Sequence, residues 1–131
     1  QKAILDFNEA IRLKQDYAEA YNNRGTAYGN LGMHQKAILD FNEAIRLKQD
    51  YAEAYNNRGT AYGNLGMHQK AILDFNEAIR LKQDYASAYN KRGVVYLDMG
   101  DKVQGCNDAQ KACGMGECML YELAKKERWC R

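Results

Sequence analysis

The side chains best able to do chemistry are four cysteines, all of which lie after residue 105. Cys106 and Cys113 are seven residues apart and would share one face of a helix, Cys118 would open the next helix, and Cys130 lies next to the C-terminus. This spacing contains no close CxxC pair, which argues against a tetrahedral zinc site and against a dithiol redox motif. Two disulfides or four buried free thiols are the main interpretations that remain.

We prefer two disulfides, because the cysteines gather in one short C-terminal segment. A helical hairpin that turns at 114–117 would place Cys113 opposite Cys118, and a C-terminal stretch that folds back would bring Cys130 to Cys106. Four cysteines allow three connectivities, and spacing alone does not choose among them. Disulfides would indicate a periplasmic or extracellular protein, whereas free thiols would indicate a cytoplasmic one.

The other reactive residues form no catalytic pattern. His34 and His68 recur at the same place between two helical segments, where a solvated turn residue is expected. The chain has no nucleophile elbow, phosphate-binding loop, paired metal-binding histidines or dinucleotide fingerprint. Its Asp and Glu residues recur as exposed helix faces require. We therefore predict that the protein is not an enzyme and uses no metal or cofactor.

Composition excludes several classes of partner. The 131 residues are 46% hydrophobic and 27% charged, which is typical of a single globular domain. Nineteen Lys and Arg against seventeen Asp and Glu leave a net charge of only +2, so no nucleic-acid partner is expected. No apolar run approaches the ~18 residues that a membrane span requires.

The elements that must position these residues are set by an internal repeat. Residues 1–34 recur unchanged at 35–68, residues 69–85 repeat the first half again, and 86–100 follow the same frame with substitutions. Within one period the apolar residues have helical spacing twice over, and proline is absent. A fixed period of this length predicts a solenoid in which each unit buries its apolar face against its neighbours.

The repeat resembles the tetratricopeptide repeat (TPR). Two units carry the small and aromatic residues of that family in register: Tyr21, Gly25, Tyr28, Ala37, Phe41 and Ala44, then Tyr55, Gly59, Tyr62, Ala71, Phe75 and Ala78. The resemblance implies an all-α fold, a right-handed α-solenoid of about eight helices, that acts as a protein–protein interaction scaffold. The single array 1–131 would comprise a leading half repeat at 1–17, full repeats at 18–51 and 52–85, a degenerate third repeat at 86–113 and a capping helix within 114–131.

Two departures from the family pattern matter. The large apolar residue of the first helix is replaced by Arg24, Arg58 and Arg92. The proline between repeats is replaced by Gln15, Gln49 and Gln83. We expect the usual turn at Lys48–Tyr51, with Asp16 and Asp50 as N-caps in capping boxes with Glu19 and Glu53. The alternative is a continuous helix that exchanges halves between chains, giving a domain-swapped assembly.

The resemblance also implies a concave groove, lined by the first helix of each repeat, that binds a peptide. The corresponding residues are Glu19, Asn22, Asn23, Thr26, Asn30, Glu53, Asn56, Asn57, Thr60, Asn64, Ser87, Asn90, Lys91, Val94 and Asp98. Carboxamides can bond both groups of an extended backbone without reading its side chains. Asn23 and Asn57 match the asparagine ladder of some long superhelices in the family, and Lys91 interrupts it with a positive charge.

The sequence also bears on two other activities. The two-carboxylate clamp that some members use for chaperone C-termini is not expected, because only Asn57 matches it, with Lys91 a loose substitute. Self-assembly is the second hypothesis, because residues 1–17 form a second helix without its partner. That arrangement would leave Ile4, Phe7 and Ile11 available to another chain, so a homo-oligomer is possible.

Overall fold

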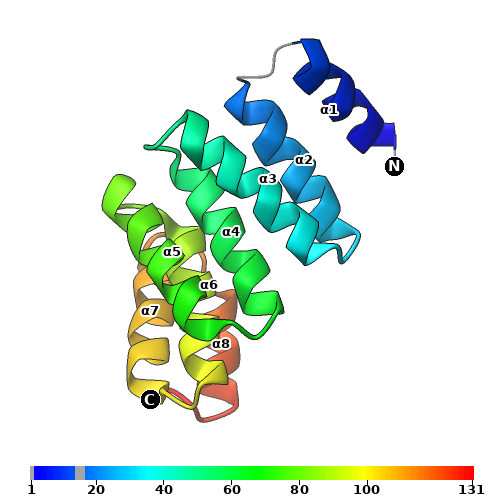
Figure 1. Cartoon of the computed structure of the whole chain (residues 1–131). Coiled ribbons are helices and arrows are strands. Elements are labelled where there is room, and N and C mark those ends of the chain that lie inside the picture. The colour runs from blue at the N-terminus through cyan, green and yellow to red at the C-terminus, as the bar shows by residue number, and fades with distance from the viewer. Residues whose placement is uncertain (1, 14–16) are drawn as a thin grey trace.

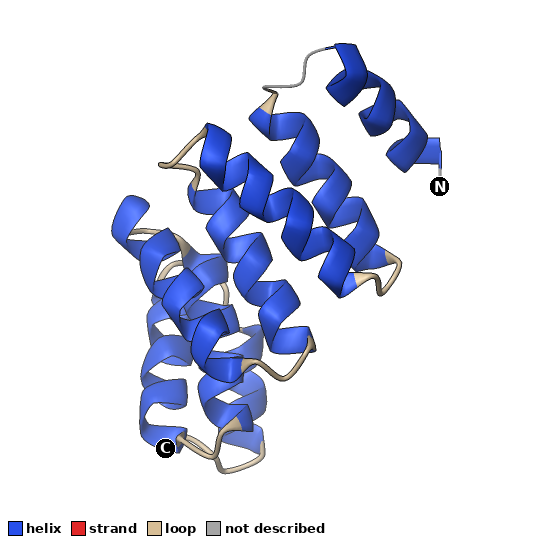
Figure 2. Cartoon of the chain, in the orientation of Figure 1, coloured by secondary structure: helices blue, strands red, loops and turns tan. Residues whose placement is uncertain are grey.

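The computed structural model describes residues 2–13 and 17–131, and within these ranges every regular element is a helix (Figures 1 and 2). The eight helices of this described part are α1 (Lys2–Leu13), α2 (Ala18–Asn30), α3 (His34–Leu47), α4 (Ala52–Asn64), α5 (His68–Leu81), α6 (Ala86–Asp98), α7 (Lys102–Gly114) and α8 (Met119–Lys126). The all-α repeat fold expected from the sequence is confirmed.

The helices pair as α2 with α3, α4 with α5 and α6 with α7, and each pair stacks on the next (Figure 1). Helix α1 packs on α2 at one end of the stack, and α8 packs on α7 at the other. Each unit therefore contacts mainly its neighbours, which is the arrangement of a solenoid.

The core of each repeat is built on the contact between a glycine and a phenylalanine. A Cβ placed on Gly59 would lie 2.8 Å from Cε1 of Phe75, so only glycine lets the two helices approach this closely. Phe75 is 1% exposed. The preceding repeat has the same contact between Gly25 and Phe41, and Phe41 is 2% exposed. The spacing of the small and aromatic residues thus fixes the distance between paired helices.

The turn within each hairpin depends on a glycine with a left-handed backbone. Gly66 has φ of +74°, and the next residue, Met67, donates its backbone N–H to the carbonyl of Tyr62 at 2.9 Å. This is the arrangement by which glycine ends a helix. The chain then re-enters a helix at His68.

The junction between repeats bends although it lacks proline. Helix α3 ends at Leu47, Lys48 is extended with φ of −142°, and α4 begins at Ala52. The capping box of Asp50 and Glu53 is a wrong prediction: the N-cap of α4 is Tyr51, and no side chain caps the helix. Tyr51 is 8% exposed and packs with Ala44, so burial of its ring, rather than a carboxylate cap, fixes the bend. Asp16 lies outside the described residues.

The arginines that replace the apolar family residue are partners of buried aspartates. Arg58 donates from Nε and Nη2 to the two carboxylate oxygens of Asp74, both at 2.8 Å, and from Nη1 to Asn42 at 2.9 Å. The same three-residue contact recurs as Arg24 with Asp40 and Asn8, and as Arg92 with Asp108 and Asn76. The expectation that acidic residues merely solvate helix faces is therefore wrong for these aspartates, which are at most 5% exposed.

The N-terminal helix is less open than the sequence suggested. Ile4 is 8% exposed, and Phe7 and Ile11 are partly buried, in a helix that packs on α2. The apolar stripe of α1 is thus partly covered by the chain itself, which weakens the reason for expecting another chain on it.

Candidate peptide-binding groove

The first helices of the three hairpins, α2, α4 and α6, contribute two adjoining hollows. The first has a volume of about 170 Å³ and lies against Thr26, Asn30, His34, Asn57, Thr60, Asn64 and Lys91. The second, of about 140 Å³, lies against Thr60, Asn64, Lys91, Val94 and Asp98. Thr60, Asn64 and Lys91 line both hollows, so the two are parts of one groove that crosses the repeats, and Phe75 and Val95 form apolar walls of the second.

Two of the expected groove residues are buried beneath this surface. Asn22 is 7% exposed and Asn56 is 3% exposed. The Asn22 carboxamide is used inside the structure: its oxygen accepts from Asn57 at 3.1 Å, and it also hydrogen-bonds the Tyr51 hydroxyl. Both residues are therefore corrected from peptide contacts to links between adjacent repeats.

Asn56 also contacts the next repeat, but through its nitrogen, and its oxygen is buried without a hydrogen-bond partner. Its Nδ2 donates to Ser87 Oγ at 3.4 Å, and its side chain also hydrogen-bonds Tyr85. Burial raises the pKa of Tyr85 above its ordinary value, while the hydrogen bond from Asn56 acts in the opposite direction. The polar helix face predicted from the sequence thus has two parts: Asn22 and Asn56 are buried, whereas Asn23 and Asn57 lie nearer the surface.

Asn57 lies nearer the surface than Asn22 and is held in place by it. Its Nδ2 donates to Asn22 and lies 3.5 Å from Thr26 Oγ1. Both contacts use the amide nitrogen, so the Asn57 oxygen is the part of this carboxamide left to accept from a ligand. Asn23, at the equivalent position one repeat earlier, is exposed.

The other sequence-predicted residues lie at the surface of α2, α4 and α6. Those that are exposed are Glu19, Asn23, Thr26, Asn30, Glu53 and Asn64, and those that are partly buried are Asn57, Thr60, Asn90 and Lys91. The Thr60 hydroxyl donates to the Asn56 carbonyl at 2.9 Å and keeps its capacity to accept. Asn90 donates to Glu117 at 2.9 Å, a partner in the turn before α8 that sequence reasoning missed.

Lys91 is the cation of the groove. Burial lowers its pKa below the usual lysine value, and the negative charge of Glu117 acts in the opposite direction. No ion pair joins Lys91 to a carboxylate among residues 2–13 and 17–131. The groove therefore presents a partly desolvated positive charge beside Thr60 and Asn64.

The histidines differ from the sequence expectation. His34 and His68 are the first residues of α3 and α5, and both are partly buried rather than solvated. His34 lines the first hollow, and its Nδ1 is buried without a hydrogen-bond partner. No group of side chains able to hold a metal ion occurs in the part of the chain that the structure describes.

All four cysteines are joined in disulfides that close the C-terminal cap. The pairs are Cys106–Cys130 and Cys113–Cys118, which is the connectivity preferred in the sequence analysis. Cross-linking loops of these lengths stabilises a fold by roughly 3–4 and about 2 kcal/mol in the chain-entropy model. Among the described helices, none is long and apolar enough to cross a bilayer.

A stack of helical hairpins with a groove along the first helices defines a helical-repeat module for protein–protein interaction. The tetratricopeptide repeat model matches residues 18–51 and 52–85, and a second TPR model matches residues 1–32. The chain belongs to the tetratricopeptide repeat family.

Solved structures with this fold are similar over most of the chain. A structure of MamA is 25% identical, with a TM-score of 0.83 over 95% of this chain and 76% of that one. The Arabidopsis OM64 TPR domain is 24% identical, with a TM-score of 0.81 over 84% and 92%. The first TPR of Spaghetti (RPAP3), bound to the HSP90 peptide SRMEEVD, is 20% identical, with a TM-score of 0.79 over 86% and 89%. A search of curated proteins gave no match.

Proposed function

We propose that the groove across α2, α4 and α6 binds an extended polypeptide of a partner protein, in part through its asparagine side chains. The observation that carries the proposal is the state of Asn57. Its nitrogen donates to Asn22 and to Thr26, so both hydrogen bonds use the nitrogen and the oxygen is left to accept from a ligand. A fixed acceptor at the edge of a polar hollow suits the backbone N–H of an extended chain.

The proposed ladder is shorter than the sequence suggested. Asn23 and Asn57 are its two members, one repeat apart, and Asn22 and Asn56 serve to hold the first helices together. Asn30 and Asn64 add exposed carboxamides on the same face. At the position that follows Asn57 in the next repeat stands Lys91, whose charge favours a peptide group of opposite sign.

A structure of the same fold with a peptide supports this use of the surface. The RPAP3 TPR holds the peptide SRMEEVD, which carries acidic residues. The present groove differs from a two-carboxylate clamp, because Asn22 is buried and Thr26 and Ser87 are uncharged. We therefore propose backbone recognition with a single cationic position.

We also propose that the protein works in an oxidising compartment, either periplasmic or extracellular. Two disulfides in a cap of about 25 residues support this, since reducing compartments keep thiols free. Counting free thiols in the native protein, before any reductant is added, tests the proposal. Four reactive thiols would contradict it.

The groove is tested with peptides selected on the wild-type protein from a random library displayed on phage. Affinities of the synthesised peptides are then measured by calorimetry for wild type and for Asn23→Ala and Asn57→Ala. Each lost bond to a peptide backbone is expected to weaken binding about fivefold, because a neutral hydrogen bond contributes about 1 kcal/mol. The matched control is Asn107→Ala, an exposed asparagine on the outer helix α7.

The control is expected to leave affinity unchanged. Equal affinity of wild type and Asn57→Ala for every selected peptide would contradict the proposed role of the ladder. Light scattering on the same samples tests the self-assembly hypothesis. If Asn57→Ala changed the molar mass and left peptide affinity alone, assembly would be the better account of this surface.

A further inference from the structure

A third hollow lies at the end of the third hairpin, next to the C-terminal tail. It has a volume of about 390 Å³ and lies against Leu97, Asp98, Lys102 and Trp129, at the C-terminal end of α6. Asp98 also lines the second hollow of the groove. The second and third hollows thus adjoin the same residue, Asp98, and the third is bounded by a tryptophan from the C-terminal tail.

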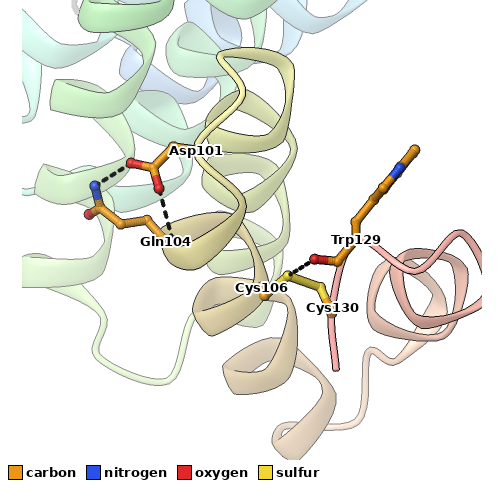
Figure 3. The surroundings of a disulfide bond; sticks show 5 residues. All are labelled: Asp101, Gln104, Cys106, Trp129 and Cys130. Carbon is orange, nitrogen blue, oxygen red and sulfur yellow. Dashed lines mark hydrogen bonds between the residues drawn. A yellow bond between two sulfur atoms is a disulfide. The ribbon is translucent and has the colours of Figure 1, made fainter.

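Trp129 reaches this place because the tail folds back after α8. Arg128 has a left-handed backbone with φ of +63°, and the N–H groups of Trp129 and Cys130 both donate to the Ala124 carbonyl, at 2.8 and 3.2 Å. Cys130 is then bonded to Cys106 of α7, and Cys106 Sγ lies 3.2 Å from the Trp129 carbonyl oxygen (Figure 3). The backbone of Trp129 is thus held, while its indole projects away from the disulfide and is 40% exposed.

Leu97, which lines the same hollow as Trp129, is also held in place. Leu97 lies across Gly105, where an added Cβ would come within 2.6 Å of Leu97 Cγ. The degenerate repeat has glycine where the preceding repeats have alanine, and this leaves room for the leucine. Asp98 and Lys102, of opposite charge, stand at the same hollow, so it carries no net charge.

We propose that this hollow is a subsite for an apolar side chain of the polypeptide bound in the groove, and that the Cys106–Cys130 disulfide positions Trp129 to form it. The inference rests on the proposed function, because the ligand must already lie along the groove. Two apolar walls with a rim of balanced charge favour an uncharged side chain over an acidic or a basic one. The volume falls within the range of sites that hold small organic groups, ~300–1,000 Å³.

The ligand is therefore an extended segment with a polar or acidic part followed, at a fixed spacing, by an apolar anchor. The polar part lies at Asn57 and Lys91, and the anchor packs on Trp129. Tryptophan is frequent among the residues that dominate binding energy at interfaces. Reduction of Cys106–Cys130 releases the tail, which removes the anchor site and leaves the rest of the groove in place.

Trp129 is the only tryptophan of the chain, so its fluorescence reports directly on this subsite. The probe is a synthesised peptide selected from the phage library on wild-type protein. Its binding is expected to shift the Trp129 emission to shorter wavelength, because the indole becomes covered. Trp129→Ala is expected to weaken binding of that peptide at least tenfold, and so is the double variant Cys106→Ser/Cys130→Ser.

The matched control is Cys113→Ser/Cys118→Ser, which removes the disulfide that does not hold the tail. It is expected to keep the affinity and the emission shift, and circular dichroism verifies that each variant retains its helices. Replacement of the peptide's apolar anchor by alanine is expected to weaken binding to wild type and not to Trp129→Ala.

Two outcomes separate this inference from the proposed function. If Asn57→Ala weakens binding while Trp129→Ala does not, and the emission stays constant, the subsite is overturned and the groove stands. If no peptide is selected, or Asn57→Ala leaves all affinities unchanged and the emission does not respond, both proposals fail. If both disulfide variants weakened peptide binding equally, the specific role of Cys106–Cys130 would be overturned.

Discussion

Replacement of Asp74 by alanine tests whether the buried ion pairs hold the repeats together. Asp74 is 5% exposed and accepts two hydrogen bonds from Arg58, whose side chain is 20% exposed. Removal of one partner of a fully buried pair costs ~3–5 kcal/mol, because the other charge is left without compensation. Arg58 retains some solvent and its bond to Asn42, so we expect Asp74→Ala to lower the free energy of unfolding by about 2 kcal/mol.

Replacement of the arginine instead leaves the more deeply buried aspartate without its partner. Arg58→Leu leaves the Asp74 carboxylate without a compensating charge, and we expect it to lower the free energy of unfolding by about 3 kcal/mol. In the double variant neither charge remains and leucine restores an apolar side chain at this position, so the loss should be about 2 kcal/mol. The difference between the summed single effects and the double effect is a coupling energy of about 3 kcal/mol.

The assay is urea unfolding at neutral pH, followed by the circular dichroism of the helices. Glu77→Ala is the matched control, because Glu77 pairs with Arg80 on the exposed face of α5 and should change stability little. The reasoning would be refuted if Asp74→Ala cost no more than this control, or if the two single effects simply added in the double variant.

Two further predictions concern packing and pH. Gly59→Ala should destabilise the protein by about 1–3 kcal/mol, since the new Cβ would lie 2.8 Å from the Phe75 ring. Gly29→Ala is the control: its Cβ would meet nothing within 4 Å, so it should be neutral or stabilising. Thermal unfolding compares the two variants. Burial lowers the pKa of Lys91 in the folded protein, so the unfolded chain binds more protons between that pKa and the ordinary lysine value, and stability should rise with pH in that window. Lys91→Met should therefore be more stable than wild type at neutral pH, with the difference shrinking as the pH rises through the folded-state pKa; a constant difference would contradict this.

The buried Arg–Asp pairs recur in the sequence with the same period as the repeat. Each Arg–Asp pair spans sixteen residues, from Arg24 to Asp40 and from Arg58 to Asp74, and the separation recurs once per repeat. A recurrent arginine in place of an apolar family residue indicates that a partner must recur with it. The identity of that partner depends on the crossing of two helices, which period and hydrophobicity do not specify.

The capping prediction failed for a related reason. Aspartate before a helix is a good N-cap in isolation, and Asp101 does cap α7 by accepting from the Gln104 N–H at 3.2 Å. At the repeat junctions, burial of Tyr51 against Ala44 outweighs the bond that Asp50 would make. Tertiary packing thus overrides a local preference of about 1 kcal/mol.

The sequence by itself determined the period, the helices, the small residues at their crossings and the face that lines the groove. These features follow from spacings of three, four and thirty-four residues, which are set within the chain. Only the tertiary structure decided which asparagines of this face are buried, such as Asn22, and which are exposed, such as Asn23. It also decided that Trp129 lies beside Leu97 and Asp98, at the end of α6. Burial depends on what the neighbouring repeat and the folded-back tail place against a side chain, and a one-dimensional pattern carries no such information.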